Sequence, residues 1–574
     1  MASDHLLNLK RRRAGVLVSL SSLLSEHSFE CGDIYSLIPL ASWAKEVGLS
    51  IIQLLPLNDT GFGISPYSSI SAFAIDPLYI SLHDLGINVR SRRKKTTSLK
   101  INQGRIRDLK FGYLREFFRS NLDQNKKDAL LFLEKQNWCK SYVTFRILYE
   151  EFEGKNWWAW DTKFHSVSYA YNYVESEKNE EMLFWAFLQK IAYDQLTYIK
   201  HFYEKLGLYL KGDMPILTSR NSCDVWEHPE YFHLHLQAGA PPDQFSKEGQ
   251  AWGFPVLNWD AIKDKSYLWW KDRLTFLENF FHLYRIDHVI GMYRIWAIPA
   301  GDENALGGWF HPQIGASRMD FENVGLLPDE FQKLGLVYPI EKDRYIFYWD
   351  FWKKDSYQSL PESTKALLFP LSEVHLREDE ILWRQSGETI LDVFETFTSM
   401  LPCAEDLGSI PGFIRDSMFE RDMIGIDVVR WTKSFTTGEF IEPKDYRKQA
   451  VSTLSTHDTS LAMDWWVNEG DTHEKQSFFF RETSDPKSKS DVLERLLTFS
   501  FSTNSLFSIQ ILQDLVFGEE EILENAVEHR INTPGTAESK NWSYRFPLSI
   551  EDFAKNKERN EKIRKIVSDS TRNP

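Results

Sequence analysis

Cysteine is rare in this chain, and its spacing argues against two classes of protein. The 574 residues contain four cysteines, none of which forms a Cys-x-x-Cys pair. That spacing indicates neither a zinc knuckle nor a disulfide framework. Free thiols suit a reducing compartment, so we expect a cytoplasmic protein without disulfide bonds. The cysteines are Cys31, Cys139, Cys223 and Cys403.

Long apolar runs and clustered basic residues are also missing. No stretch of 18 apolar residues occurs, so we expect no membrane-spanning helix. Basic residues 10–13 and the apolar stretch 14–24 imitate a signal peptide, but serines interrupt the stretch and no cleavage site follows. The alternation in that stretch predicts a strand instead. The net charge is −15 and the basic runs, 11–13 and 90–95, are short, so nucleic acid is not an expected partner.

Aromatic residues, in contrast, are abundant, with 20 Trp, 23 Tyr and 40 Phe. A chain of this length can bury a large core, which accommodates many such rings. Aromatic rings also build sugar-binding surfaces, because the apolar face of a pyranose stacks on them. For a single tryptophan the core is the more frequent location, so composition leaves both explanations open.

Eight short apolar runs recur along the chain and alternate with segments of helical periodicity. Several are almost continuously apolar, as expected of parallel strands buried on both faces. Eight such strands, each followed by helix, predict an α/β fold of the (β/α)8 TIM-barrel type, although a doubly wound sheet would give similar runs. The runs are 15–23, 49–57, 206–217, 281–289, 400–408, 423–429, 450–458 and 507–515.

Two longer segments between these runs predict inserted subdomains. The first, about residues 80–205, follows the second run and has a helical pattern. The second, about residues 300–385, separates the fourth run from the fifth. Residues 549–574 are expected to form a C-terminal helix whose charged tail frays.

Polar residues stand at the C-terminal ends of four of the runs. In a (β/α)8 barrel, that end of the strands carries the active site. Carboxylates on separate strand ends suit glycosidic chemistry, in which one carboxylate attacks the sugar and another transfers a proton. The residues are Asp213, Asp287, Glu405 with Asp406, and His457 with Asp458.

Two of these carboxylates have neighbours that suit opposite roles. Side chains i and i+2 of a strand share a face, so Arg285 is expected to pair with Asp287 and keep it ionised. Glu405 has no cation beside it in the sequence. Burial, together with a nearby like charge such as that of Asp406, is expected to raise the pKa of Glu405, as a general acid requires.

Each candidate also has a structural explanation. A strand Arg–Asp pair is more often structural, Asp458 before Thr459 could cap a helix, and Asp213 could be a turn residue. Three histidines also lie near Glu227 and Glu230, but their spacing matches no standard ligand pattern, so no metal site is expected. They are His228, His233 and His235.

Nine sequence blocks in a common order resemble the 4-α-glucanotransferases, also called amylomaltases or disproportionating enzymes. The resemblance runs from about residue 13 to 548 and implies a single catalytic (β/α)8 domain, 13–548, with the two inserts. The blocks are RRAGVLVSLSSL, ISPYSSISAFAIDPLYISL (64–82), GDMPIL with DVW (212–226), AGAPPDQFSKEGQAWGFP (238–255), RIDHVIG (285–291), AEDLG (404–408), STHDTS (455–460), LQD (512–514), and RINTPGT with NWSYR (530–545).

The resemblance implies a retaining transferase that needs no metal or cofactor. Such an enzyme cleaves α-1,4-glucans and passes a glycosyl or maltooligosyl unit to the 4-hydroxyl of an acceptor glucan or glucose. By position, Asp287 is the nucleophile that carries the covalent intermediate, Glu405 is the general acid/base, and Asp458 stabilises the transition state. The implied partners are maltooligosaccharides and glycogen-like α-glucans.

Six further positions match substrate-binding residues of the family. Arg285 and His457 are implied to orient hydroxyls and carboxylates, and Asp213 to lie beside the donor sugar. Two aromatic positions are implied to line the glucan groove, and segment 239–250 matches a loop that overhangs it. The six are Tyr67, Asp213, Gln250, Trp252, Arg285 and His457.

Some positions depart from the compact bacterial members of the family. Phe254 and Leu257 stand where Asn and Tyr are usual, and Ala462 where Arg is common. Residues 287 and 405 are 118 positions apart, further than in those members. These features resemble the plant cytosolic disproportionating enzyme. Its N-terminal starch-binding modules are expected to be absent, because the resemblance begins near residue 13.

Other activities are compatible with the same three carboxylates. A hydrolase would use them with water as the acceptor, and a maltose-using transglucosidase would pass glucose to a polysaccharide. A non-catalytic glucan-binding protein is a third possibility, but it would have no use for all three carboxylates.

Overall fold

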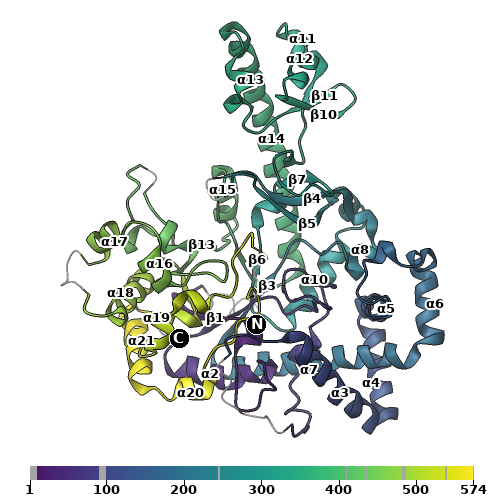
Figure 1. Cartoon of the computed structure of the whole chain (residues 1–574), viewed down its shortest axis with the longest axis vertical. Helices are drawn as coiled ribbons and strands as arrows, with labels where there is room; N and C mark the ends of the chain where they lie inside the picture. The colour runs from purple at the N-terminus through teal and green to yellow at the C-terminus, as the bar shows by residue number, and fades with distance from the viewer. Residues whose placement is uncertain are drawn as a thin grey trace.

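The computed structural model describes residues 10–89, 98–243, 246–408, 410–434, 436–480, 486–536 and 540–572 (Figure 1). The basic run 90–95, and residues 244 and 245 of the overhanging loop, lie outside this part of the chain. A helix with the length and apolarity of a membrane span does not occur among the described residues.

Eight parallel strands form the central sheet and follow one another around it in chain order. A bridge between Cys403 and Ile424 joins the two edge strands and closes the sheet into a barrel. Each predicted apolar run overlaps one of these strands, which confirms the (β/α)8 fold over the doubly wound sheet. The strands are β1 Arg13–Val18, β2 Ile51–Leu54, β3 Tyr209–Met214, β6 Leu283–Ile286, β12 Leu401–Ala404, β13 Gly425–Val428, β14 Ala450–Thr453 and β15 Phe507–Ile511.

Double burial explains the apolar runs. Every residue of β1, β2, β3, β6, β14 and β15 is buried. One face of each strand fills the barrel and the other packs on helices, so both faces select apolar residues. The helices around the barrel include α2 Leu37–Glu46, α7 Asn179–Leu206, α10 Leu268–Glu278, α15 Gly412–Glu420 and α18 Lys489–Ser502 (Figure 1).

Between β2 and β3, the chain forms a set of helices on one side of the barrel (Figure 1). A buried cluster ties these helices to the barrel: Asp59, which follows β2, accepts hydrogen bonds from Tyr142 at 2.7 Å and Arg146 at 3.2 Å. The helices are α3 Gln103–Ser120, α4 Leu122–Lys135, α5 Asn137–Glu151, α6 Val167–Glu177 and α7.

Two segments of the chain, one between β3 and β6 and one between β6 and β12, build a projection that extends away from the barrel (Figure 1). Its tip has an apolar core of its own, centred on Phe321, Phe331 and Leu336. A sheet of order β5-β4-β7-β8 lies at its base, and a sheet of order β10-β11-β9 lies near its tip. The elements are β4 Phe232–Ala240, β5 Gln250–Leu257, β7 Ile295–Pro299, β8 Trp309–His311, β9 Ala316–Ser317, α11 Arg318–Asn323, α12 Pro328–Lys333, β10 Val337–Glu341, β11 Arg344–Phe347, α13 Asp355–Gln358 and α14 Glu362–Phe397.

Helix α14 connects this projection to the barrel. It has 36 residues, and Leu368 and Leu371 near its start pack in the core of the tip. Ile390 and Phe394 near its end pack in the core of the barrel. One continuous helix is therefore anchored in both cores.

The fraying expected after the C-terminal helix does not occur as far as residue 572. Helix α21, Lys557–Asp569, buries Ile563 and Val567, and the guanidinium of Arg572 beyond it is fully buried. The prediction of a frayed tail was wrong because charge along the segment concealed a tertiary anchor beyond the helix. The guanidinium donates to the carbonyl oxygens of Arg13 (3.2 Å), Phe501 (2.6 Å), Thr503 (2.8 Å), Ser505 (2.7 Å) and Leu506 (3.1 Å).

We expect Arg572→Ala to destabilise the fold. The substitution leaves buried carbonyl groups without a partner, and hydrogen bonds to charged groups contribute about 1.5–3 kcal/mol. Thermal unfolding should therefore show a melting temperature several degrees lower. Lys555→Ala, which removes an exposed pair with Asp552, should change stability by less than about 0.5 kcal/mol. An unchanged melting temperature for Arg572→Ala would show that the anchor contributes nothing.

Candidate active site

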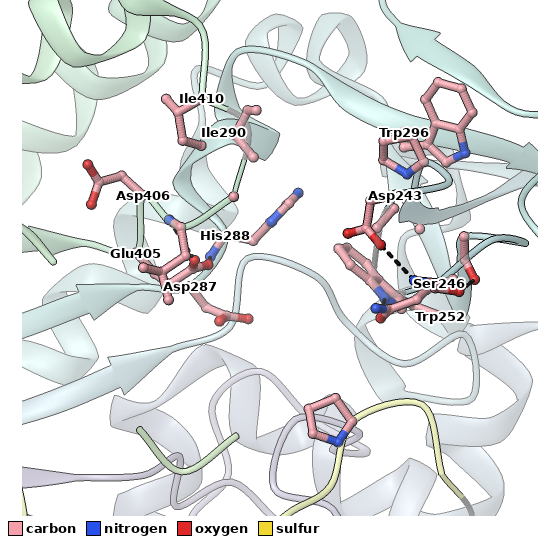
Figure 2. Close-up of a pocket in the computed structure, with 18 of the residues that line it drawn as sticks. Asp243, Ser246, Trp252, Asp287, His288, Ile290, Trp296, Glu405, Asp406 and Ile410 are labelled. Atoms are coloured by element: carbon pink, nitrogen blue, oxygen red, sulfur yellow. Dashed lines mark hydrogen bonds between the residues drawn. The ribbon is translucent and has the colours of Figure 1, made fainter. Parts of the chain in front are cut away.

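A cleft of about 3020 Å³ opens at the carboxyl ends of the barrel strands. Asp287, Glu405 and Asp458 follow β6, β12 and β14, and all three line this cleft. Asp287, His288 and Glu405 are grouped together on its wall (Figure 2). The structure thus brings the three predicted carboxylates into one cavity.

Strand register places Glu405 beside Asp287. Strands β12 and β6 are parallel, and Ala404 pairs with Ile286 at the last position of the ladder. The next residue on each strand is the carboxylate. Beyond it the chain turns sharply, because His288 adopts a left-handed backbone conformation (φ 48°).

Arg285 pairs with two carboxylates at once. Its Nη1 atom lies 2.8 Å from Asp287 and 2.8 Å from Asp213, which is its register partner on β3. Burial and Asp213 raise the pKa of Asp287, whereas Arg285 and His457 oppose this rise. The predicted ion pair is present, but burial still leaves the pKa of Asp287 above its ordinary value. Arg285 thus acts in the expected direction, toward the ionised form of Asp287, while burial opposes it.

Glu405 has the environment of a proton donor. Its two carboxyl oxygens accept hydrogen bonds from the backbone amides of His288 at 2.9 Å and Leu407 at 3.0 Å. Burial raises the pKa of Glu405 to about 7, and the charge of Asp287 acts in the same direction. At neutral pH this carboxyl group is therefore divided between its acid and base forms.

Asp406 is not the like charge that acts on Glu405, contrary to the prediction. Its carboxylate turns to the other side of the chain, where Arg447 lies 2.6 Å away and the amide of Ile426 donates at 2.8 Å. Arg447 also bridges to Asp427 at 2.7 Å. Asp406 thus binds the backbone of β13 and the guanidinium of Arg447. The negative charge that raises the pKa of Glu405 is that of Asp287.

Asp458 is held as an anion by two neighbours. His457 Nε2 lies 3.0 Å from one carboxyl oxygen, and Asn532 donates to the other at 2.7 Å. Burial would raise the pKa of Asp458, but these contacts outweigh it and lower the pKa to about 2. The same pairing raises the pKa of His457 despite its burial.

Tyr67 connects the Arg285–Asp213 pair to the His457–Asp458 pair. Its hydroxyl donates to Asp213 at 2.8 Å and lies 3.0 Å from His457 Nε2, and its ring stacks on that imidazole. The Asp213 side chain is fully buried behind Arg285 and Tyr67, so it does not line the cleft. The other eight predicted site residues do line it.

Gln250 and Trp252, at the start of β5, line the cleft beside His288. The indole of Trp252 donates to Gln250 at 3.0 Å and meets the ring of His288 edge-on, with centroids 5.0 Å apart. Burial lowers the pKa of His288 to about 4, so this imidazole is neutral at pH 7.

The three histidines near Glu227 are used in local contacts. His228 lies 3.3 Å from Glu230, and His233 packs its ring against His235 and His311. No group of three His, Cys, Asp or Glu side chains in the described part of the chain has the geometry to hold a metal ion.

Sequence reasoning missed two residues of the site. Asn532 orients Asp458, and Trp542 packs against Tyr67 and His457 with centroids 5.5 Å and 5.8 Å away. Asn532 lies in the block RINTPGT and Trp542 in the block NWSYR. Both blocks resemble the family, but neither residue was predicted to belong to the site.

Comparisons with known proteins agree with this geometry. The glycoside hydrolase 77 family, described as 4-alpha-glucanotransferase, matches residues 18–549. A 4-alpha-glucanotransferase of Chlamydia pneumoniae is 30% identical over 575 residues, covering 96% of this chain and 95% of its own. The rice 4-alpha-glucanotransferase DPE2 is 27% identical, covering 98% of this chain and 70% of its own.

Solved structures show the same fold. Amylomaltase from Streptococcus agalactiae, in complex with acarbose, superposes with a TM-score of 0.75 at 22% identity and covers 98% of this chain and 100% of its own. Amylomaltase from Corynebacterium glutamicum superposes with a TM-score of 0.70 at 18% identity, covering 99% of this chain and 76% of its own. With the family match over most of its length, the chain belongs to the 4-alpha-glucanotransferase family.

Proposed function

We propose that this 4-alpha-glucanotransferase works by double displacement, with Asp287 as nucleophile and Glu405 as general acid/base. The observation that carries the proposal is the register that sets these two carboxylates side by side. Their surroundings differ, since Arg285 pairs with Asp287 whereas two backbone amides hold Glu405. Two adjacent carboxyl groups with different proton affinities are what a retaining mechanism needs.

In the first step, protonated Glu405 donates its proton to the glycosidic oxygen while Asp287 attacks the anomeric carbon. The glycosidic bond breaks, the shortened glucan leaves with the proton, and the donor unit is esterified to Asp287. Asp458, held ionised by His457 and Asn532, stabilises the positive charge that develops on the sugar ring.

In the second step, ionised Glu405 takes the proton of an acceptor 4-hydroxyl. The acceptor oxygen attacks the anomeric carbon, the ester bond breaks and Asp287 is regenerated as the carboxylate. Two inversions at one carbon retain the α configuration.

The proposed substrates are α-1,4-linked maltooligosaccharides and glycogen-like α-glucans. The cleft volume of about 3020 Å³ exceeds the roughly 300–1,000 Å³ typical of small-molecule sites. The rings of Tyr67, Trp252 and Trp542 line it and offer apolar faces to pyranose rings.

Incubation with maltotriose tests the proposal directly. Transfer gives a ladder of longer and shorter oligosaccharides plus glucose, whereas hydrolysis gives shorter sugars alone. Efficient use of maltose only when glycogen is present would favour the transglucosidase alternative. Unchanged maltotriose, maltose and longer maltodextrins would contradict the proposal.

The pH profile of kcat/KM should be bell-shaped. The first step needs Glu405 protonated, and its pKa of about 7 makes activity fall as pH rises above 7, by up to about tenfold per unit. Activity should also fall on the acid side, because Asp287, whose pKa burial raises, must be ionised to attack. With a glycosyl fluoride donor, whose leaving group needs no proton, kcat/KM should no longer fall at alkaline pH. A flat alkaline limb with maltotriose would contradict the role of Glu405.

A further inference from the structure

The cleft that holds Asp287 continues into the projection. Residues that follow β11, and residues of α14 from 372 to 383, line the same cavity as the three carboxylates. The proposed chemistry assigns no task to them. Figure 1 shows β11 in the part of the molecule that stands away from the barrel, and α14 running from that part toward the barrel.

Two tryptophans lie on this outer wall. Trp352 is 38% exposed, and Trp349 is half-buried, meeting Trp296 edge-on with centroids 6.1 Å apart. A large aromatic ring left exposed in a concave surface often marks a binding site.

Polar atoms on the same wall have no hydrogen-bond partner. Among the described residues, buried atoms of this kind include Trp349 Nε1, Gln313 Oε1 and His375 Nε2. His375 is 8% exposed, its Nδ1 is 2.9 Å from Glu378, and its Nε2 is 3.7 Å from Asp320, beyond hydrogen-bonding distance. Buried polar groups are normally paired, so these three indicate a missing partner.

The chemistry of this wall fits a neutral polyhydroxylated chain. The indole N–H donates, the Gln313 carbonyl accepts, and His375 Nε2 accepts when Nδ1 carries the proton toward Glu378. A sugar hydroxyl can both donate and accept, and a pyranose face can stack on the indole of Trp352. The cleft volume has room for a chain well beyond a trisaccharide.

We propose that the projection binds the distal part of a long α-glucan whose reacting end lies at Asp287. Trp352 and Trp349 stack on the sugar rings, and Gln313 and His375 bind the hydroxyls. This inference rests on the proposed function. It means that the projection makes the enzyme prefer long glucans.

The test compares Trp352→Ala with a matched control on two donors. The ratio of kcat/KM for glycogen to that for maltotriose should fall about tenfold, mainly through a higher KM for glycogen, the loss expected of one stacking contact. Trp158→Ala removes a ring of similar exposure, 43%, that does not line the cleft, and it should leave the ratio unchanged. An unchanged ratio in Trp352→Ala would overturn the inference, as would an equal loss on both donors.

A binding measurement separates this inference from the proposed chemistry. Co-sedimentation with glycogen should be weaker for the Asp287→Asn, Trp352→Ala double variant than for Asp287→Asn alone. Weaker binding supports the projection site even if the nucleophile were assigned wrongly. Equal binding by both variants refutes the site while leaving the role of Asp287 intact.

Discussion

Asp287→Asn should reduce transfer between maltooligosaccharides by about 10⁴-fold or more. The amide is a poor nucleophile, so no glycosyl ester forms and neither step proceeds. The fold should survive, because asparagine is almost the same size and Arg285 keeps its 2.8 Å contact with Asp213. Product analysis with maltotriose measures the loss, and tryptophan fluorescence can show that maltooligosaccharides still bind.

Asp445→Asn provides the matched control for this prediction. Asp445 is exposed and lines the same cleft, so the variant makes the same chemical change away from the carboxylate pair. Its activity should stay within about twofold of the parent enzyme, the usual range for surface substitutions. Substantial turnover by purified Asp287→Asn, free of deamidated enzyme, would remove Asp287 from the role of nucleophile.

Glu405→Gln should lower kcat with maltooligosaccharides by about 10²–10⁴-fold. Glutamine keeps the shape of the side chain, and its carbonyl oxygen can still accept one of the backbone amides that now bind Glu405. It cannot donate a proton to the leaving glucan or remove one from the acceptor. Both steps therefore slow, although Asp287 can still attack.

Activated donors distinguish this defect from simple damage to the site. With an α-glycosyl fluoride, Glu405→Gln should form the intermediate, and mass spectrometry should find the sugar on the peptide that contains Asp287. Azide needs no general base, so adding it should restore turnover and give a glycosyl azide of α configuration. Failure of both rescues, with substrate binding retained, would count against Glu405 as the acid/base.

The barrel could be predicted because its strands are buried on both faces. Burial of β1, residues Arg13–Val18, leaves a continuous apolar run over 14–18 that is visible without any knowledge of its neighbours. The same topology places residues after the strands at one end of the barrel, which is why Asp287, Glu405 and Asp458 were expected together. The ends of the strands were less predictable, since β6 stops where His288 takes a left-handed conformation.

Contacts between residues far apart in the sequence could not be predicted. Arg447, 41 positions after Asp406, turns that carboxylate away from Glu405, and Asn532 reaches Asp458 from 74 positions away. Arg572 likewise donates to the carbonyl oxygen of Arg13, the first residue of β1, near the other end of the chain. Hydrophobic periodicity reports local burial, so it contains no information about such polar partners.

The closeness of Asp287 and Glu405 has a consequence for timing within one turnover. The negative charge of Asp287 helps to hold the proton on Glu405, as the acid of the first step. In the proposed mechanism, esterification of Asp287 would remove that charge and lower the pKa of Glu405, so the group would become a base when the acceptor arrives. Hydrolysis or transfer of the ester restores the charge and draws the proton back. If Asp287 is the nucleophile, as we propose, the proton affinity of Glu405 should fall and rise once in each catalytic cycle.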